Sequence, residues 1–141
     1  MCIRDSDNTW SGFWIAGEAT PELSDNTADS NHRHGFVWKG GDGGRVSGNR
    51  AGENTIYGFM IVDAGVDFDS NRSIRNGSTG VTWFGTASGR AADNLVRGNG
   101  AHGLFLTDDS DVDLLGNTVR NNAWSGISFP VSYTHLRAHE T

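Results

Sequence analysis

Apolar residues recur along the chain in a fixed relation to a row of glycines. The first and third residues after each of these glycines are apolar, as Phe36 and Trp38 are after Gly35. Such alternation predicts a short strand with one buried face. The glycines that anchor the pattern are Gly12, Gly35, Gly58, Gly80, Gly103 and Gly126, at intervals of 22 or 23 residues.

Two further apolar columns precede each glycine. The column twelve residues before it is Leu23, Val46, Phe68, Ala91 and Leu114. The column seven residues before it is Ala28, Ala51, Ser73, Val96 and Val119. Three short strands and three turns in 22 or 23 residues predict one coil of a parallel β-helix, a solenoid in which each coil packs on the next. We therefore predict an all-β fold of about five such coils.

Two rows of asparagine share this period. Asn26, Asn49, Asn71, Asn94 and Asn117 lie nine residues before the glycines. Asn8, Asn31, Asn54, Asn76, Asn99 and Asn122 lie four residues before them. Equivalent residues on successive coils are about 4.8 Å apart, so we expect two ladders of hydrogen-bonded amides. Asparagine tolerates the left-handed backbone of tight turns, and we expect the glycines to occupy a turn that a Cβ would block.

The segment GNTVRNNAWSGISF (116–129) resembles the repeat N-x-V-x-x-N-x-x-x-G-I-x-L of right-handed parallel β-helix proteins in the pectate-lyase-like superfamily. The resemblance covers residues 7–129. It implies an extracellular, cell-surface or periplasmic protein related to polysaccharides, namely a lyase, hydrolase or epimerase scaffold. The leucine-rich repeat also stacks asparagines, but its L-x-x-L-x-L spacing is missing here.

Tyr57-Gly58-Phe59 resembles the start of the Y-G-F-D-P-H motif of mannuronan epimerases. Met60, Ile61 and Val62 stand where that motif has Asp-Pro-His. The catalytic pair of the motif is therefore not carried over, and we assign no catalytic residue. A non-catalytic, adhesin-like binding solenoid stays open beside an enzyme scaffold whose chemistry lies outside this segment.

Residues 1–6 and 130–141 break the repeat. MCIRDS can be encoded by ATG TGT ATA AGA GAC AG, and the reverse complement of this string lies within a DNA sequence that can encode PVSYTH. Inverted DNA at both ends resembles a translated sequencing adapter around a metagenomic fragment. We therefore expect residues 7–129 to be a β-helix truncated at both ends, with its signal region, caps and remaining coils missing, and the two flanking segments to stay off the stack.

Composition excludes some partners. The formal net charge of −6 argues against nucleic acid, which requires a basic face. No run of about 20 apolar residues is present to span a membrane. Glycines at 40–44 (GGDGG) predict a flexible turn, because no Lys-Ser/Thr follows as in a phosphate-binding loop. His34 and His102 each precede an anchor glycine, and we interpret them as turn residues.

The residues two places after the glycines point outward in this pattern. They are Trp14, Val37, Met60, Thr82, Phe105 and Ser128. Aromatic faces stack on sugar rings, so Trp14 and Phe105 are candidate ligand contacts. The candidate polar contacts beside them are Lys39, Tyr57, Asp63 and His102. The alternative is that a further segment or a partner covers an apolar stripe.

Acidic residues suggest two further features. Asp108, Asp109 and Asp111 could supply oxygen ligands to Ca²⁺, although we favour a solvated acidic turn as the simpler interpretation. A column with charges of alternating sign lies thirteen residues before the glycines. It reads Glu22, Arg45, Asp67, Arg90 and Asp113. We interpret this column as a ladder of surface ion pairs, with an arginine–carboxylate pair for polysaccharide lysis as the alternative.

Overall fold

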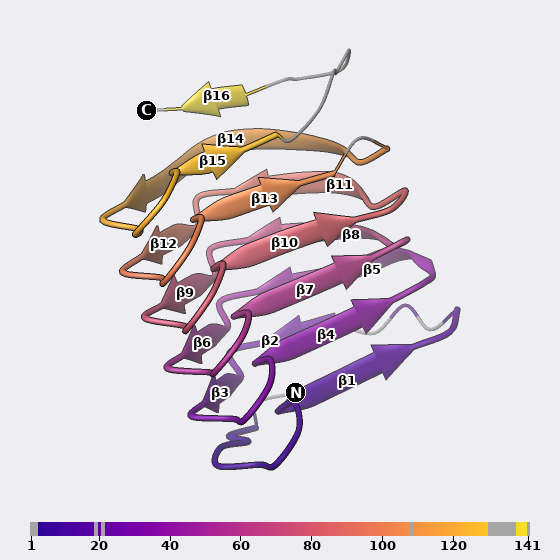
Figure 1. Ribbon diagram of the computed structural model, residues 1–141. Coiled ribbons are helices and arrows are strands. Elements are labelled where there is room, and N and C mark those ends of the chain that lie inside the picture. Colours follow the sequence, from indigo (N-terminus) through magenta and orange to yellow (C-terminus); the bar gives the residue numbers. More distant parts are fainter. Residues whose placement is uncertain (1–2, 19, 21, 108, 130–137, 141) are drawn as a thin grey trace.

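The computed structural model describes residues 3–18, 20, 22–107, 109–129 and 138–140. The chain winds into a stack of coils that rises from the N-terminal end to the C-terminal end (Figure 1). Neighbouring strands within the stack run parallel, and from β4 to β10 they are offset by 22 or 23 residues, as the spacing of the glycines predicts. The prediction of an all-β solenoid is confirmed.

The first side of the solenoid is the sheet of strands that follow the anchor glycines, which we call the first sheet. Its six strands form one uninterrupted parallel sheet. They are β1 (Phe13–Ala16), β4 (Phe36–Lys39), β7 (Phe59–Val62), β10 (Val81–Phe84), β13 (Leu104–Leu106) and β15 (Ile127–Ser128).

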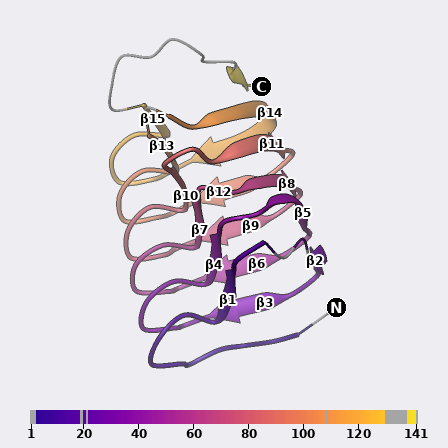
Figure 2. The ribbon, with the colours of Figure 1, turned by 90° about the vertical axis from the view of Figure 1, so that its right-hand side faces the viewer.

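The second and third sides are joined through the long strand β14 (Asp111–Arg120), which turns the corner at Gly116 with φ 64. Figure 2 shows these sides with the coils stacked one above another. Before β14, the second sheet contains β2 (Glu22–Ser24), β5 (Asp42–Ser47), β8 (Gly65–Asp69) and β11 (Ser88–Ala92). The third sheet contains β3 (Thr27–Asp29), β6 (Arg50–Gly52), β9 (Arg72–Ile74) and β12 (Leu95–Arg97).

Apolar side chains from all three sides fill the interior. Phe13, Phe36 and Phe59 stack face to face on successive coils, with ring centroids 4.7 and 4.8 Å apart. Phe68 meets Phe59 edge-on from the second sheet, and Trp83 also packs edge-on against Phe68. The three apolar columns of the sequence therefore converge on one core, because strand alternation sends every one of them inward.

Both asparagine ladders form at the corners of the coils. The Asn71 Oδ1 atom accepts hydrogen bonds from the backbone N–H and the Nδ2 of Asn49, at 2.9 and 3.1 Å. The Asn71 Nδ2 atom donates to the carbonyl of Val46 and to Asn94 Oδ1, at 2.8 and 3.2 Å. Every polar atom of this buried amide is thus satisfied, which explains why asparagine occupies a buried corner.

The left-handed backbone lies one residue before each corner asparagine and not at the asparagine itself. Asp25, Ser70 and Asp93 have φ of 56. The full set is Asp25, Gly48, Ser70, Asp93 and Gly116 in one row, and Asp7, Ser30, Glu53, Arg75, Gly98 and Asn121 in the other. Our expectation that the ladder asparagines supply this conformation is wrong. The inward amides of the asparagines stabilise the corner through their hydrogen bonds, and the preceding residue adopts the left-handed conformation that the turn requires.

Five of the six anchor glycines, Gly12 to Gly103, are required by close packing, whereas a Cβ on Gly126 would meet only an ordinary contact at 3.7 Å. A Cβ on Gly35 would lie 2.7 Å from the carbonyl oxygen of Gly58 and 2.8 Å from Asn54 Nδ2. The anchor glycines do not have positive φ, so any residue could adopt their backbone conformation. The prediction that a Cβ is blocked is confirmed, but the obstacle is the neighbouring coil and its asparagine.

The expectation of a flexible turn at residues 40–44 is wrong in part. The glycine-rich segment 40–44 is not wholly a turn, because β5 begins at Asp42 and runs through Gly43 and Gly44. Gly44 belongs in this strand because a Cβ there would overlap the indole of Trp38, including Cη2 at 2.6 Å. The bulky side chain of Trp38 therefore requires a glycine in the facing strand, at a position that the sequence alone suggests is part of a turn.

The flanking segments also join the stack where they are described. Arg4 pairs with Thr27, and β16 (Ala138–Glu140) pairs with β14. The ends of a solenoid expose unpaired strand edges, to which an extended segment adds through its backbone. This pairing corrects our expectation that both ends stay off the stack, and it leaves the origin of the segments open. His135 and Leu136 lie outside the described residues.

Candidate ligand-binding face on the first sheet

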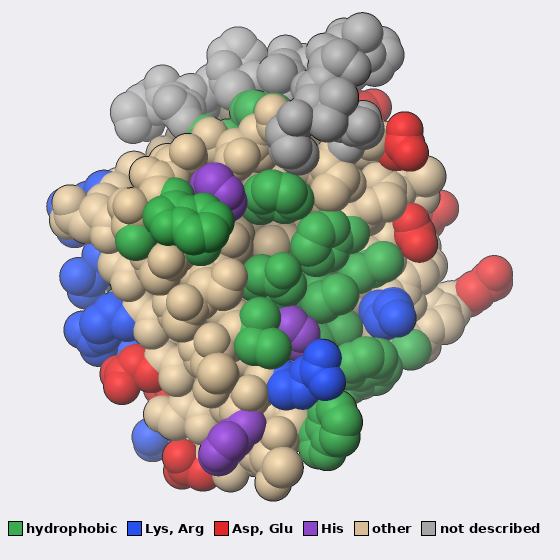
Figure 3. Space-filling view, viewed as in Figure 1, with side chains coloured by type: hydrophobic (Ala, Val, Ile, Leu, Met, Phe, Trp, Pro, Cys, Tyr) green, Lys and Arg blue, Asp and Glu red, His purple; other side chains and the backbone are tan. Residues whose placement is uncertain are grey.

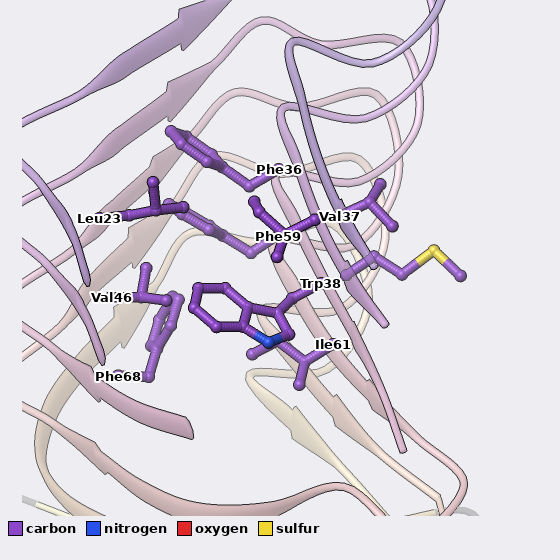
Figure 4. A pocket seen from close by; sticks show the side chains of 10 residues that line it. Leu23, Phe36, Val37, Trp38, Val46, Phe59, Ile61 and Phe68 are labelled. Carbon is purple, nitrogen blue, oxygen red and sulfur yellow. The ribbon is translucent and has the colours of Figure 1, made fainter. Parts of the chain in front are cut away.

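The residues two places after the anchor glycines form one column across the outer surface of the first sheet. Trp14 lies beside Val37, and Val37 beside Met60, in direct register. Val37 points away from Phe36 and Trp38, which enter the interior (Figure 4). The same register continues through Thr82, Phe105 and Ser128. The column therefore faces outward.

Exposure varies strongly along this column. Trp14 is 61% exposed, whereas Val37 and Thr82 are 0% and 1% exposed. Phe105 and Met60 are half-buried. Small residues are covered by the larger ones beside them, so the column presents a packed apolar surface with a few prominent rings. Apolar side chains form a broad oblique stripe over this face (Figure 3).

Aromatic side chains from neighbouring columns extend this surface into a continuous run. Phe84 lies between Tyr57 and Phe105, with centroid separations of 6.0 Å to each. His102 continues the run from Phe105 at 5.6 Å to Trp124 at 5.2 Å. We call Tyr57, Phe84, Phe105, His102 and Trp124 the aromatic run. It crosses successive coils on one face of the molecule.

Sequence reasoning missed two members of the aromatic run. Phe84 is four residues after Gly80, and Trp124 is two residues before Gly126, so neither lies in the column that drew attention. Outward alternation along β10 identifies Phe84 in retrospect. The side chain of Trp124 is 71% exposed at a corner, which its sequence position does not reveal.

His34 stands at the N-terminal end of this surface and is buried, contrary to its interpretation as a surface turn residue. It is 5% exposed and stacks on Tyr57, with ring centroids 5.0 Å apart and planes at 13°. Its Nδ1 accepts a hydrogen bond from the backbone N–H of Tyr57 at 3.3 Å, which requires a neutral ring. Burial, with Arg33 adding to it, lowers the pKa of His34 to about 4.

The predicted polar contacts differ in their availability. Lys39 Nζ lies 5.6 Å from the centroid of the Trp14 ring, so the two side chains form one cation–π pair. The Nδ1 atom of His102 is buried and has no hydrogen-bond partner among the described residues. Asp63, by contrast, accepts hydrogen bonds from the backbone N–H and hydroxyl of Thr86 at 2.9 and 3.3 Å. Its carboxylate thus stabilises the turn at Thr86 through these two hydrogen bonds.

The acidic turn offers no assembled metal centre in the part of the chain that the structure describes. Asp109 and Asp111 are exposed, and Asp108 lies outside the described residues. No group of three or more His, Cys, Asp or Glu side chains within the described ranges is arranged to hold a metal ion. The interpretation of this turn as a Ca²⁺ site stays a prediction.

The column of alternating charges forms on the second sheet. Register places Arg45 between Glu22 and Asp67, and Arg90 between Asp67 and Asp113. Neither arginine forms an ion pair with a described residue. The alternation is therefore present, but no ion pair with a described residue forms at Arg45 or Arg90, which corrects the ladder of contacts that we expected. Long exposed side chains gain too little from such contacts to be held in place.

No helix long and apolar enough to cross a membrane occurs among the described residues.

Comparison with known proteins gives matches of two kinds. The family model "Right handed beta helix region" matches residues 11–137. The chain is also similar to crystal structures of the periplasmic alginate epimerase AlgG. A double mutant of that enzyme superimposes with a TM-score of 0.82 at 17% identity, over 98% of this chain and 38% of that one. The protein without those substitutions gives a TM-score of 0.82 at 16% identity, over 99% and 38% of the two chains.

At the level of sequence, no curated protein matches the chain significantly. The present chain spans little more than a third of the length of the epimerase structures, and their low identity shows a shared fold. The family model covers most of the sequence, including every anchor glycine from Gly12 to Gly126. The chain therefore belongs to the right-handed β-helix family.

Proposed function

We propose that this chain is part of an extracellular or periplasmic β-helix protein that binds a polysaccharide along the outer surface of its first sheet. The observation that carries the proposal is the aromatic run on that surface. Aromatic rings that follow one another across parallel coils form a linear track, and a glycan is a linear polymer of rings with apolar faces. Trp14 and Lys39 would extend the contact at the N-terminal end.

Three properties of the surface support this ligand class. Tyr57, Phe84 and Phe105 are half-buried and pack against one another, so little conformational entropy is lost when a ligand binds them. Polar groups flank the rings, including the ammonium group of Lys39 and the hydroxyl of Tyr57, and can bond to hydroxyl groups. The fold is shared with a periplasmic enzyme that acts on alginate, which makes a polysaccharide a natural occupant of such a surface.

Two versions of the function differ in whether the surface turns its ligand over. An epimerase, lyase or hydrolase needs an acid or base at the sugar. Met60 occupies the position of an acid in the epimerase motif, and the Asp63 carboxylate is engaged by Thr86. These observations favour a binding solenoid for this segment, with any chemistry elsewhere in a longer protein.

The test is a glycan-binding screen on the purified chain and two variants. A double variant Trp14→Ala/Phe105→Ala removes two rings from the face. A matched control, Leu115→Ala, removes an exposed apolar side chain of 44% exposure from β14 on another side. We expect binding to fall about tenfold or more in the double variant and to persist in the control, with no turnover by any of them. Binding that is equal in all three proteins would contradict the proposal.

A further inference from the structure

The third sheet presents one arginine from each of four adjacent strands. Arg50 lies on β6, Arg72 on β9, Arg97 on β12 and Arg120 on β14. Ala51, Ser73, Val96 and Val119, each next to one of these arginines, point into the solenoid, so the arginines point outward. We call these four residues the arginine track. Basic side chains accordingly gather along the edge of the molecule beside β6, β9 and β12 (Figure 3).

The track is regular because the coils are regular. Arg50 is in direct register with Arg72, and Arg97 with Arg120. Adjacent strands are about 4.8 Å apart, so the charges of each pair start from backbone positions about 5 Å apart. Between β9 and β12 the track shifts by two residues along the strand, about 7 Å, and crosses the sheet obliquely. It therefore presents a row of cations over four coils.

Folding alone would favour a different arrangement. Like charges side by side on neighbouring strands destabilise a sheet. The second sheet of the same solenoid avoids them, because Glu22, Arg45, Asp67, Arg90 and Asp113 alternate in sign through the same kind of register. The third sheet instead repeats the positive sign, in a chain whose formal net charge is −6. This contrast points to an external anion.

Most of the positive charge on the track is not neutralised within the described residues. Arg50 pairs with Asp29. Arg72, Arg97 and Arg120 form no ion pair with any residue that the structure describes. The Nε atom of Arg97 is also buried without an acceptor. An anion seated on the track would instead bind the guanidinium groups of Arg72 and Arg120, whose side chains are exposed.

We propose that the arginine track is a second binding site, which takes the carboxylates of an acidic polysaccharide. Guanidinium groups bind carboxylates through paired hydrogen bonds, and a polymer with one carboxylate on each sugar matches a row of arginines with one on each coil. Nucleic acid fits less well, because base stacking needs aromatic side chains. The other outward residues of the arginine-bearing strands on this sheet are Gly52, Ile74, Leu95 and Thr118, and none of them is aromatic.

The site rests on the proposed function only for the general class of ligand, since it lies on a different sheet from the aromatic run. The two sites differ in their physical signature. Binding at the arginine track depends on charge and weakens as salt screens it, whereas ring stacking on the first sheet is largely insensitive to salt. Neutral and acidic glycans therefore separate the two proposals.

The experiment measures binding of polygalacturonate to the full chain by calorimetry at low and at physiological salt. The test variant is Arg72→Gln/Arg120→Gln, which changes two exposed side chains. The matched control is Arg45→Gln/Arg90→Gln, which changes the net charge equally on the second sheet. Dextran sulfate, neutral dextran and single-stranded DNA serve as comparison ligands. Trp14→Ala/Phe105→Ala reports on the other face.

We expect polygalacturonate binding to fall about tenfold in the test variant and to stay within about twofold in the control. Adding Arg97→Gln should weaken it further, and Trp14→Ala/Phe105→Ala should leave it unchanged. Undetectable binding of polygalacturonate, equal loss in both arginine pairs, or tighter binding of DNA or dextran sulfate would each overturn the proposal. Failure of the unsubstituted protein to bind any neutral glycan would count against the first-sheet site and leave this one standing.

Discussion

Replacing Asn94 by leucine removes an amide from the middle of one asparagine ladder. The Asn94 Oδ1 atom accepts hydrogen bonds from the backbone N–H and Nδ2 of Asn71, at 2.8 and 3.2 Å. Its Nδ2 donates to the carbonyl of Phe68 and to Asn117 Oδ1, at 2.9 and 2.8 Å. All four bonds are buried and disappear in the variant.

The four losses differ in weight. The backbone N–H of Asn71 has no other acceptor among the described residues, so it is stranded at a cost of about 1–3 kcal/mol. Asn71 Nδ2 keeps its bond to Val46, and Asn117 Oδ1 keeps the backbone N–H of residue 94. These two partial losses, and that of the Phe68 carbonyl, which loses the Asn94 amide donor, cost about 0.5–1 kcal/mol each. After a gain of about 1 kcal/mol from burying leucine, we expect a net destabilisation of about 3 kcal/mol.

The assay is urea unfolding followed by tryptophan fluorescence, combined with hydrogen exchange of the Asn71 amide. Thr118→Leu is the matched control, because Thr118 is exposed on the third sheet and its side chain has no ladder contacts. We expect a lower unfolding midpoint and faster exchange at Asn71 in Asn94→Leu only. An unfolding free energy within about 0.5 kcal/mol of the control would refute the account of the ladder.

Two further predictions concern buried positions. His34 is neutral in the fold because burial and Arg33 lower its pKa to about 4. Its contribution to the free energy of unfolding is therefore complete above about pH 6.5 and is lost as the pH falls toward 4, and we expect the wild type to lose up to about 3 kcal/mol of stability over that window relative to His34→Gln. Equal pH profiles of stability for the two proteins would contradict this. Gly44→Ala should lower the free energy of unfolding by about 2 kcal/mol, because its Cβ overlaps Trp38. Gly126→Ala should lower it little, because the nearest contact of its Cβ is at 3.7 Å. Equal unfolding midpoints for the two variants would count against that packing.

The sequence predicts the solenoid because its constraints repeat. An asparagine whose amide must bond up and down the stack and two inward apolar residues recur from coil to coil, and the anchor glycines from Gly12 to Gly103 have no room for a Cβ. Each coil alone is a weak signal, but five coils in phase leave one fold. The same repetition, through strand alternation alone, predicts that Trp14 and Phe105 lie on an outward face.

The candidate site is less predictable because it depends on side chains between the columns. Phe84 and Trp124 join the aromatic run through ring contacts that cross columns. His34 is buried by stacking on Tyr57, although its place before a glycine suggests a turn. Gly44 is in a strand because of Trp38, a residue on the opposite side of the interior. Such pairings depend on rotamers and on three-dimensional neighbours.

The most direct test of the glycan-binding face uses the tryptophan indole signals of the protein. Trp14 and Trp124 are 61% and 71% exposed on or beside the proposed face, whereas Trp38 and Trp83 are buried in the core at 3% and 0%. Two-dimensional NMR during titration with a bound glycan from the screen reports on these four, and on the exposed Trp10, at once. The account predicts shifts for the indole N–H signals of Trp14 and Trp124, with Trp38 and Trp83 unmoved. Saturation by the glycan with the Trp14 and Trp124 signals unchanged would contradict it.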